Sequence, residues 1–112
     1  MSQRYLIALG SNKRHHRHGL PPLVLRAALA ALADLGVTID AAAPVQSSAP
    51  VGPSLRRYAN SAALITTDLA PDELLDLLKI VERRFGRRFG QRWSSRVLDL
   101  DIVLWSGGAW SS

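Results

Sequence analysis

A pair of carboxylates near the end of the chain is the feature that most strongly suggests chemistry. Asp99 and Asp101 alternate with the apolar residues Leu98, Leu100 and Ile102. Because side chains alternate across a β-strand, a strand here places both carboxylates on one face, roughly 6.6 Å apart along the backbone. Magnesium is bound by one or two carboxylates together with phosphate oxygens. The pair is therefore a candidate metal site for a polyphosphate, and an acidic stripe on a solvated strand face is the alternative.

The segment before this pair is rich in arginine. Between residues 83 and 96 there are six arginines and no acidic residue. Guanidinium groups are planar, permanently charged and well suited to phosphate. Arginines near a helix end also occur as a plain solvated surface or as partners of acids such as Glu82. Beside the carboxylate pair, they indicate a site for a polyphosphate and a divalent metal. The six residues are Arg83, Arg84, Arg87, Arg88, Arg92 and Arg96.

Three further residues suit a flat ligand. Trp93 lies in the middle of the arginine-rich segment, where it can stack on a ring or anchor the loop as a hydrophobic plug. Tyr58 and Asn60 are expected on one face of a strand. An asparagine amide offers a donor and an acceptor to the edge of a heterocycle, and bonding to nearby backbone is its alternative role.

Two other motifs give weaker evidence of a functional site. The run from His15 to His18 is expected to be a basic loop rather than a metal site, because its histidines are adjacent, interleaved with a cation and lack a carboxylate partner. Gly10-Ser11-Asn12 is not a P-loop, because the Gly-Lys-Ser/Thr signature does not follow it.

The composition is that of one folded domain. The chain has 112 residues, 47% of them apolar, and a formal net charge of +5, which favours anionic partners. It has no cysteine, so a disulfide scaffold, a thiolate zinc site and a cysteine nucleophile are excluded. Neither a signal peptide nor an apolar run approaching the roughly 20 residues of a membrane span is found. We expect a cytoplasmic protein.

The hydrophobic pattern predicts four strands and two helices. Each helix is expected to begin at a proline, Pro21 or Pro71, and to end at a glycine, Gly36 or Gly86. The strands are expected at residues 5–9, 37–44, 58–67 and 97–105, with a loop over 45–57. This β-α-β-β-α-β order predicts an α+β fold, a ferredoxin-like sandwich with an antiparallel sheet and both helices on one face.

Short motifs along the whole chain point to one family. They are Tyr5–Asn12, Pro50–Pro53, Tyr58–Asn60, Leu69–Leu75, Glu82 with Gly86-Arg87, and Arg92–Ile102. The last block is the most specific. In this order and spacing the motifs resemble the 6-hydroxymethyl-7,8-dihydropterin pyrophosphokinase family, also called 2-amino-4-hydroxy-6-hydroxymethyldihydropteridine diphosphokinases.

The resemblance implies an ATP-dependent diphosphotransferase of folate biosynthesis. The products would be AMP and the pterin diphosphate. The enzyme would use ATP as co-substrate and two Mg²⁺ ions as cofactor. Asp99 and Asp101 match the family's metal-binding carboxylates, and with Arg92 and Arg96 they form the implied catalytic set. The implied ATP-binding residues are Glu82, Arg87, Arg92 and Arg96. The implied pterin-binding residues are Ser48, Ala49, Val51, Tyr58, Asn60 and Trp93.

The chain also departs from the family pattern. Ser94-Ser95 replaces a Gly-Pro pair, which could change how the loop closes over ATP, and Phe89 replaces an arginine. Family members continue for some tens of residues with a Pro-His block, a further basic residue and an aromatic residue. We therefore expect residues 1–112 to be a single pyrophosphokinase-like domain that is incomplete at its C-terminus.

Two other functions fit parts of the sequence. One is a non-catalytic remnant that binds nucleotide or pterin without turnover. The other is an RNA-binding module, since such modules share the element order and a basic charge. RNA-binding sheets stack bases on two or three aromatic side chains, and here the first and third strands offer only Tyr5 and Tyr58. We expect a monomer that binds small molecules, with no nucleic-acid or membrane partner.

Overall fold

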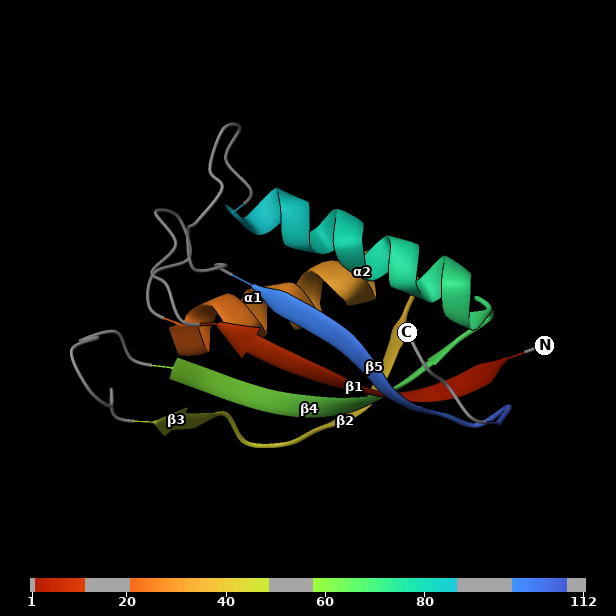
Figure 1. Cartoon of the computed structure of the whole chain (residues 1–112), viewed down its shortest axis with the longest axis horizontal. Helices are drawn as coiled ribbons and strands as arrows, with labels where there is room; N and C mark the ends of the chain where they lie inside the picture. Colours follow the sequence, from red (N-terminus) through yellow and green to blue (C-terminus); the bar gives the residue numbers. More distant parts are fainter. Residues whose placement is uncertain (1, 12–20, 49–57, 87–97, 109–112) are drawn as a thin grey trace.

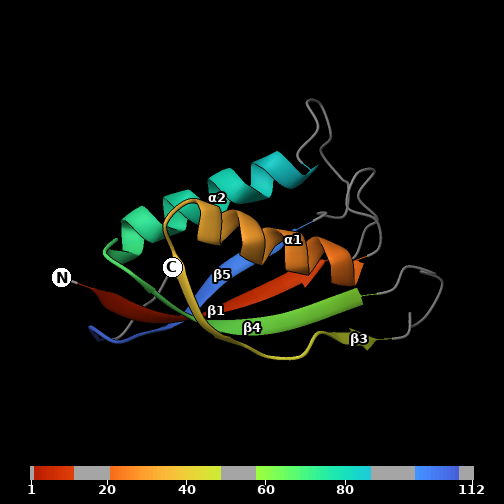
Figure 2. The same cartoon turned by 180° about the vertical axis from the view of Figure 1, so that it is seen from behind.

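The computed structural model of the chain describes residues 2–11, 21–48, 58–86 and 98–108. Its elements follow one another as β1 (Gln3–Ser11), α1 (Pro21–Asp34), β2 (Thr38–Ala42), β3 (Gln46–Ser48), β4 (Tyr58–Thr67), α2 (Pro71–Gly86) and β5 (Asp99–Trp105). The predicted β-α-β-β-α-β order is confirmed, and β3 is an addition to it. Both helices lie on one face of the sheet, and the other face is open among the described elements (Figure 1; Figure 2 shows the view from behind).

The strands form one antiparallel sheet with the order β2-β4-β1-β5, and β3 also pairs with β4. β2 and β3 together make one interrupted edge strand along β4. Between them the Ala43 amide donates to the Ala62 carbonyl at 2.8 Å, and the Ser61 hydroxyl donates to the Ala43 carbonyl at 2.8 Å. The sequence interpretation of 45–57 as loop was wrong for Gln46–Ser48. These three residues are polar, so pairing with β4 rather than apolar alternation makes them a strand.

The two predicted helices are confirmed at Pro21–Asp34 and Pro71–Gly86. α1 ends in a Schellman motif, in which Val37 N donates to Leu32 O and Gly36 N donates to Ala33 O, both at 3.1 Å. Gly36 has a φ of 94°, a left-handed conformation that glycine adopts without a steric penalty. The motif leads the chain directly into β2. Val37, between the helix and the strand, is buried in the core.

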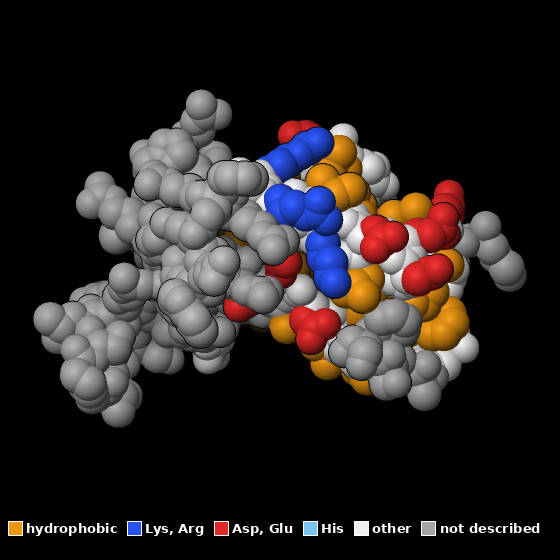
Figure 3. Space-filling view, turned by 45° about the horizontal axis from the view of Figure 1, so that its top comes forward, with side chains coloured by type: hydrophobic (Ala, Val, Ile, Leu, Met, Phe, Trp, Pro, Cys, Tyr) orange, Lys and Arg blue, Asp and Glu red, His pale blue; other side chains and the backbone are white. Residues whose placement is uncertain are grey.

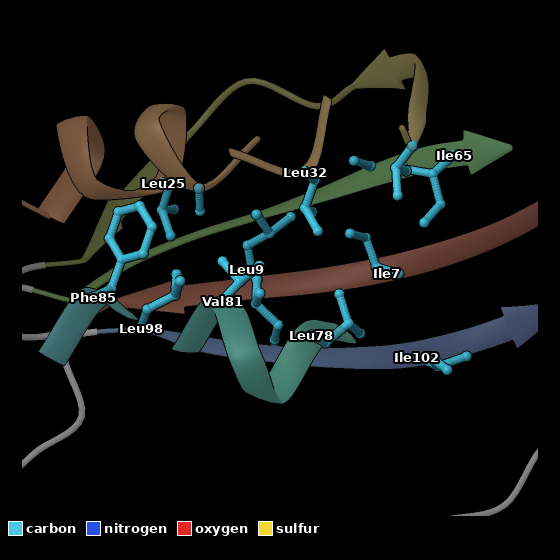
Figure 4. Close-up of a cluster of buried hydrophobic side chains, with 14 of the residues drawn as sticks. Ile7, Leu9, Leu25, Leu32, Ile65, Leu78, Val81, Phe85, Leu98 and Ile102 are labelled. Carbon is cyan, nitrogen blue, oxygen red and sulfur yellow. The ribbon is translucent and has the colours of Figure 1, made fainter. Parts of the chain in front are cut away.

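The core lies between the helices and the inner face of the sheet. In Figure 4, Leu25 and Leu32 of α1 and Leu78, Val81 and Phe85 of α2 point toward the side chains of β1, β4 and β5. Burial of these side chains is the main force that holds the layers together. The core is continued by residues of β1, β4 and β5 and by Leu98, which precedes β5: Tyr5, Ile7, Leu9, Ala59, Ala63, Ile65, Leu98, Leu100 and Ile102.

Candidate active site

The carboxylate pair lies on the open face of β5. Leu98, Leu100 and Ile102 are buried toward the helices, and Asp99 and Asp101 between them are exposed. The predicted sharing of one face by the two aspartates is therefore confirmed. The alternation is enforced by the core, because a shift of one residue would bury both charges and expose three apolar side chains.

A cross-strand row connects this pair to Asn60. In the register of the sheet, Gly10 of β1 lies opposite Asn60 of β4 on one side and opposite Asp99 of β5 on the other. Directly opposed residues of antiparallel strands have side chains on the same face. Asn60 and Asp99 thus share the open face, two strand spacings or roughly 10 Å apart. Gly10 places no side chain between them.

The next row repeats the arrangement. Ala8 lies opposite Ala62 on one side and opposite Asp101 on the other. Gly10, Ala8 and Ala62 therefore form a floor of small residues, which we call the small-residue floor. Asn60 borders it on β4, and the two aspartates border it on β5. No side chain of this floor is larger than a methyl group between the Asn60 amide and the carboxylate pair.

Asp101 is oriented by its own strand. Its Oδ1 atom accepts a hydrogen bond from the Ile102 amide at 2.9 Å. The bond holds one carboxylate oxygen toward the backbone of β5. A carboxylate has further acceptor positions, so the residue keeps the capacity to bind a cation.

Glu82 reaches the same strand from α2. Its Oε2 atom accepts a hydrogen bond from the Leu100 amide at 2.7 Å, and the contact is partly buried. Leu100 lies between the two aspartates in the sequence, so Glu82 is bound to the backbone of the carboxylate-bearing segment. The family resemblance implied a place near ATP for Glu82, and the sequence did not reveal this hydrogen bond to Leu100. The distance between the two residues in the chain left no local pattern that could reveal it.

Positive charge gathers at the end of α2 that leads toward the site. Asp72 and Glu73 lie in its first turn, and Arg83 and Arg84 lie in its last. Figure 3 shows Lys and Arg side chains grouped on one part of the described surface, with acidic side chains on more than one side of them. Acids at the N-terminus and bases at the C-terminus also complement the helix dipole.

Several predicted site residues fall outside the described part of the chain. They are Ala49, Val51, Arg87, Arg92, Trp93 and Arg96. Ser48 and Tyr58 are paired opposite each other where β3 and β4 begin their ladder. Gln46 lies opposite Asn60 in the same ladder, so the backbone of β3 runs beside the asparagine.

The donor set fits magnesium with phosphate better than a metal held by protein alone. Among the described residues, no group of three or more His, Cys, Asp or Glu side chains could hold a metal ion. Two carboxylates on one strand face leave most coordination positions to other oxygens. Magnesium characteristically takes one or two carboxylates and completes its octahedron with phosphate and water.

The first strand gives the RNA-binding alternative no support. Tyr5 is 1% exposed and faces the helices, where its hydroxyl donates to the Leu69 carbonyl at 2.6 Å. It cannot stack a base on the open face, which presents two carboxylates instead. In the described part of the chain, neither helix is long and apolar enough to cross a membrane.

Comparison with known proteins gives a consistent result. The family model for 7,8-dihydro-6-hydroxymethylpterin-pyrophosphokinase matches residues 6–109. The chain is 42% identical over 106 residues to a 2-amino-4-hydroxy-6-hydroxymethyldihydropteridine pyrophosphokinase of Pseudomonas aeruginosa, a match that covers 93% of this chain and 62% of the relative. It is 41% identical over 101 residues to the Haemophilus influenzae protein of the same name, covering 88% of this chain and 60% of the relative.

A Pseudomonas putida protein of that name is 37% identical over 107 residues, and the match covers 95% of this chain and 85% of the relative. The chain therefore spans about 60% of the length of the first two relatives and most of the third.

Proposed function

This chain belongs to the 7,8-dihydro-6-hydroxymethylpterin-pyrophosphokinase family, and on that premise we propose that the full-length protein transfers pyrophosphate from ATP to 6-hydroxymethyl-7,8-dihydropterin. The products are AMP and the pterin diphosphate, an intermediate of folate biosynthesis. The observation that carries the proposal is the open face of the sheet, where Asn60 and the pair Asp99 and Asp101 border one small-residue floor.

The two sides of the small-residue floor suit different substrates. Asn60 offers a donor and an acceptor to the edge of the pterin. Asp99 and Asp101 are the proposed ligands of two Mg²⁺ ions that accompany ATP, and the ions neutralise phosphate charge and orient the polyphosphate when bound. The pterin hydroxymethyl group would then lie over Gly10 and Ala8, between the amide and the metal-bound phosphates. The family resemblance adds Ser48, Ala49, Val51, Tyr58 and Trp93 on the pterin side and Arg87, Arg92 and Arg96 on the ATP side.

The reaction needs positioning and charge neutralisation rather than a protein nucleophile. The hydroxymethyl oxygen attacks the β-phosphorus in line and forms a new O–P bond. The bond between the β-phosphorus and the oxygen that bridges to the α-phosphate breaks, and AMP leaves with that oxygen. The hydroxyl proton is released to water. Holding two substrates in line can supply much of the rate enhancement, because effective molarities of oriented groups are very large.

The test is AMP formation from ATP, Mg²⁺ and 6-hydroxymethyl-7,8-dihydropterin by the full-length protein. Asp99→Asn and Asp101→Asn each remove a formal charge where metal and phosphate charges must balance. Loss of one such electrostatic contact costs on the order of a hundredfold in rate or more. Asp76→Asn is the matched control, because Asp76 is exposed on α2 and lies away from the floor.

The outcomes separate the alternatives. Near-normal AMP formation by both variants would mean that the pair is only a solvated acidic face. Binding of ATP and pterin by the unsubstituted protein without AMP formation would instead identify a non-catalytic remnant. The monomeric state and the cytoplasmic location stay predictions; a relative from Pisum sativum is named as a mitochondrial folate synthesis bifunctional protein.

A further inference from the structure

Glu82 accepts a hydrogen bond from the peptide group that follows Asp99 in the candidate metal site. The amide nitrogen of Leu100 belongs to the peptide unit that links Asp99 to Leu100. Because a peptide unit is planar, its orientation fixes the ψ angle of Asp99. The 2.7 Å bond from this amide to Glu82 Oε2 therefore controls the direction in which the backbone leaves Asp99.

β5 has particular need of such a restraint. It lies at the edge of the sheet that the described strands form, with β1 as its neighbour on one side. Edge strands lack the second ladder that holds a central strand in place. Here two successive outward amides are both bonded to carboxylates, Leu100 to Glu82 and Ile102 to Asp101. Carboxylate acceptors make charge-assisted hydrogen bonds, which are stronger than neutral ones.

Glu82 can act in this way because α2 is fixed against the core. Leu78, Val81 and Phe85, its helical neighbours, are all buried. The carboxylate therefore extends from a rigid element to a strand that carries the chemistry. A site residue must be held within about half an ångström of its productive position, and this requires support from residues that are themselves locked by packing.

We propose that Glu82 is a positioning residue for the metal site: its carboxylate holds the Asp99–Leu100 peptide so that Asp99 and Asp101 face the Mg²⁺–ATP complex together. This inference rests on the proposed function and differs from a direct contact between Glu82 and ATP. It predicts that Mg²⁺–ATP binding depends more on the hydrogen-bond acceptor of residue 82 than on its negative charge.

Two substitutions distinguish the roles. Glu82→Gln keeps a carbonyl oxygen that can accept the Leu100 hydrogen bond but removes the charge. Glu82→Ala removes both. Asp76→Ala is the matched control, since it deletes an exposed acidic side chain from the same helix.

The first measurement needs no ligand. Amide hydrogen exchange at Leu100 is compared with exchange at Leu9, its partner on β1. In Glu82→Ala the Leu100 amide should exchange roughly tenfold faster or more, because it loses a hydrogen bond to a charged acceptor. It should stay close to the unsubstituted rate in Glu82→Gln and in Asp76→Ala. Unchanged protection in Glu82→Ala would overturn the proposal whatever the protein catalyses.

The second measurement is the affinity for ATP with Mg²⁺, followed by calorimetry, with the pterin titrated separately. Glu82→Ala should weaken Mg²⁺–ATP binding at least fivefold and leave pterin affinity within twofold, and Glu82→Gln should restore most of the loss. Equal loss in Glu82→Gln and Glu82→Ala would show that the charge acts directly and would refute the positioning role. Failure of the proposed function would appear differently, as absent AMP formation with the Leu100 exchange pattern intact.

Discussion

Ala8→Val should stabilise the fold and impair the site at the same time. Ala8 lies on the open face of β1, between Ala62 and Asp101 in the sheet register. Valine is among the residues preferred in strands, because its branched side chain packs on a pleated surface. The substitution adds two methyl groups to the small-residue floor without altering a charge or a hydrogen bond.

The expected effects are a gain in the free energy of unfolding and a loss of substrate affinity, and each can be measured separately. Strand propensities span about 1 kcal/mol between residue types, so we expect a gain of roughly 0.5 kcal/mol in the free energy of unfolding. Extra methyl groups in an occupied space cost about 1–3 kcal/mol through overpacking. Since about 1.4 kcal/mol corresponds to a tenfold change in affinity, substrate binding should weaken roughly tenfold or more.

Urea denaturation gives the stability, and calorimetric titration with hydroxymethyldihydropterin in the presence of an ATP analogue and Mg²⁺ gives the affinity. Ala41→Val is the control, because Ala41 is exposed on β2 opposite Leu64 and away from the floor. It should change stability by a similar amount and leave affinity unchanged. Normal binding by a stabilised Ala8→Val protein would refute the placement of substrates over this floor. Weak binding in a destabilised protein would also contradict the reasoning, because the predicted signs differ.

Two predictions concern the fold beneath the site. Burial, followed by the nearby charges of Asp72 and Glu73, raises the pKa of Tyr5 above its ordinary value of 10.0. The folded state therefore favours the protonated phenol, and its contribution to stability is fully present below pH 10 and lost as the pH rises toward the folded pKa. Tyr5→Phe should cost about 1 kcal/mol at pH 7 by removing the hydrogen bond to Leu69 O. In urea titrations from pH 7 to 11 that cost should shrink above pH 10, and a constant difference would contradict the shift. Leu78→Ala truncates a side chain that is 0% exposed and should cost about 2–5 kcal/mol in the same assay at pH 7; a loss below 1 kcal/mol would mean that α2 packs loosely on the sheet.

Local patterns were sufficient to predict most of the fold. The prolines at 21 and 71 and the glycines at 36 and 86 mark the ends of both helices, because they favour the first turn and the C-terminal cap respectively. Alternation of apolar residues predicted β4 at its observed bounds and β5 around the aspartates. The predicted second strand was longer than β2, which ends at Ala42 before the interruption at the edge of the sheet.

The geometry of the site required the register of the sheet. Alternation places Asp99 and Asp101 on one face, and it does not say which residue of another strand lies beside them. The row from Asn60 through Gly10 to Asp99 depends on β1 being central between β4 and β5. The bond between Glu82 and Leu100 likewise depends on how α2 lies along β5. These are long-range relations, and no local sequence pattern specifies them.

The same register favours one end of the open face for the proposed chemistry. At the other end Leu6 lies opposite Leu64 on β4 and Leu104 on β5, and the last two are 42% and 62% exposed. The branched side chains of this row project from the open face of the sheet. Toward the C-terminal end of β1, which lies beside the first residues of β4 and β5, the central position changes from Leu6 to Ala8 and then to Gly10. The side chain above β1 therefore becomes smaller in successive rows. A ligand that must reach both Asn60 and the carboxylate pair can approach the backbone only where that central side chain is small. The decrease from leucine to glycine along β1 therefore favours this end of the open face for the proposed site, and Asp99 and Asp101 supply its negative charge.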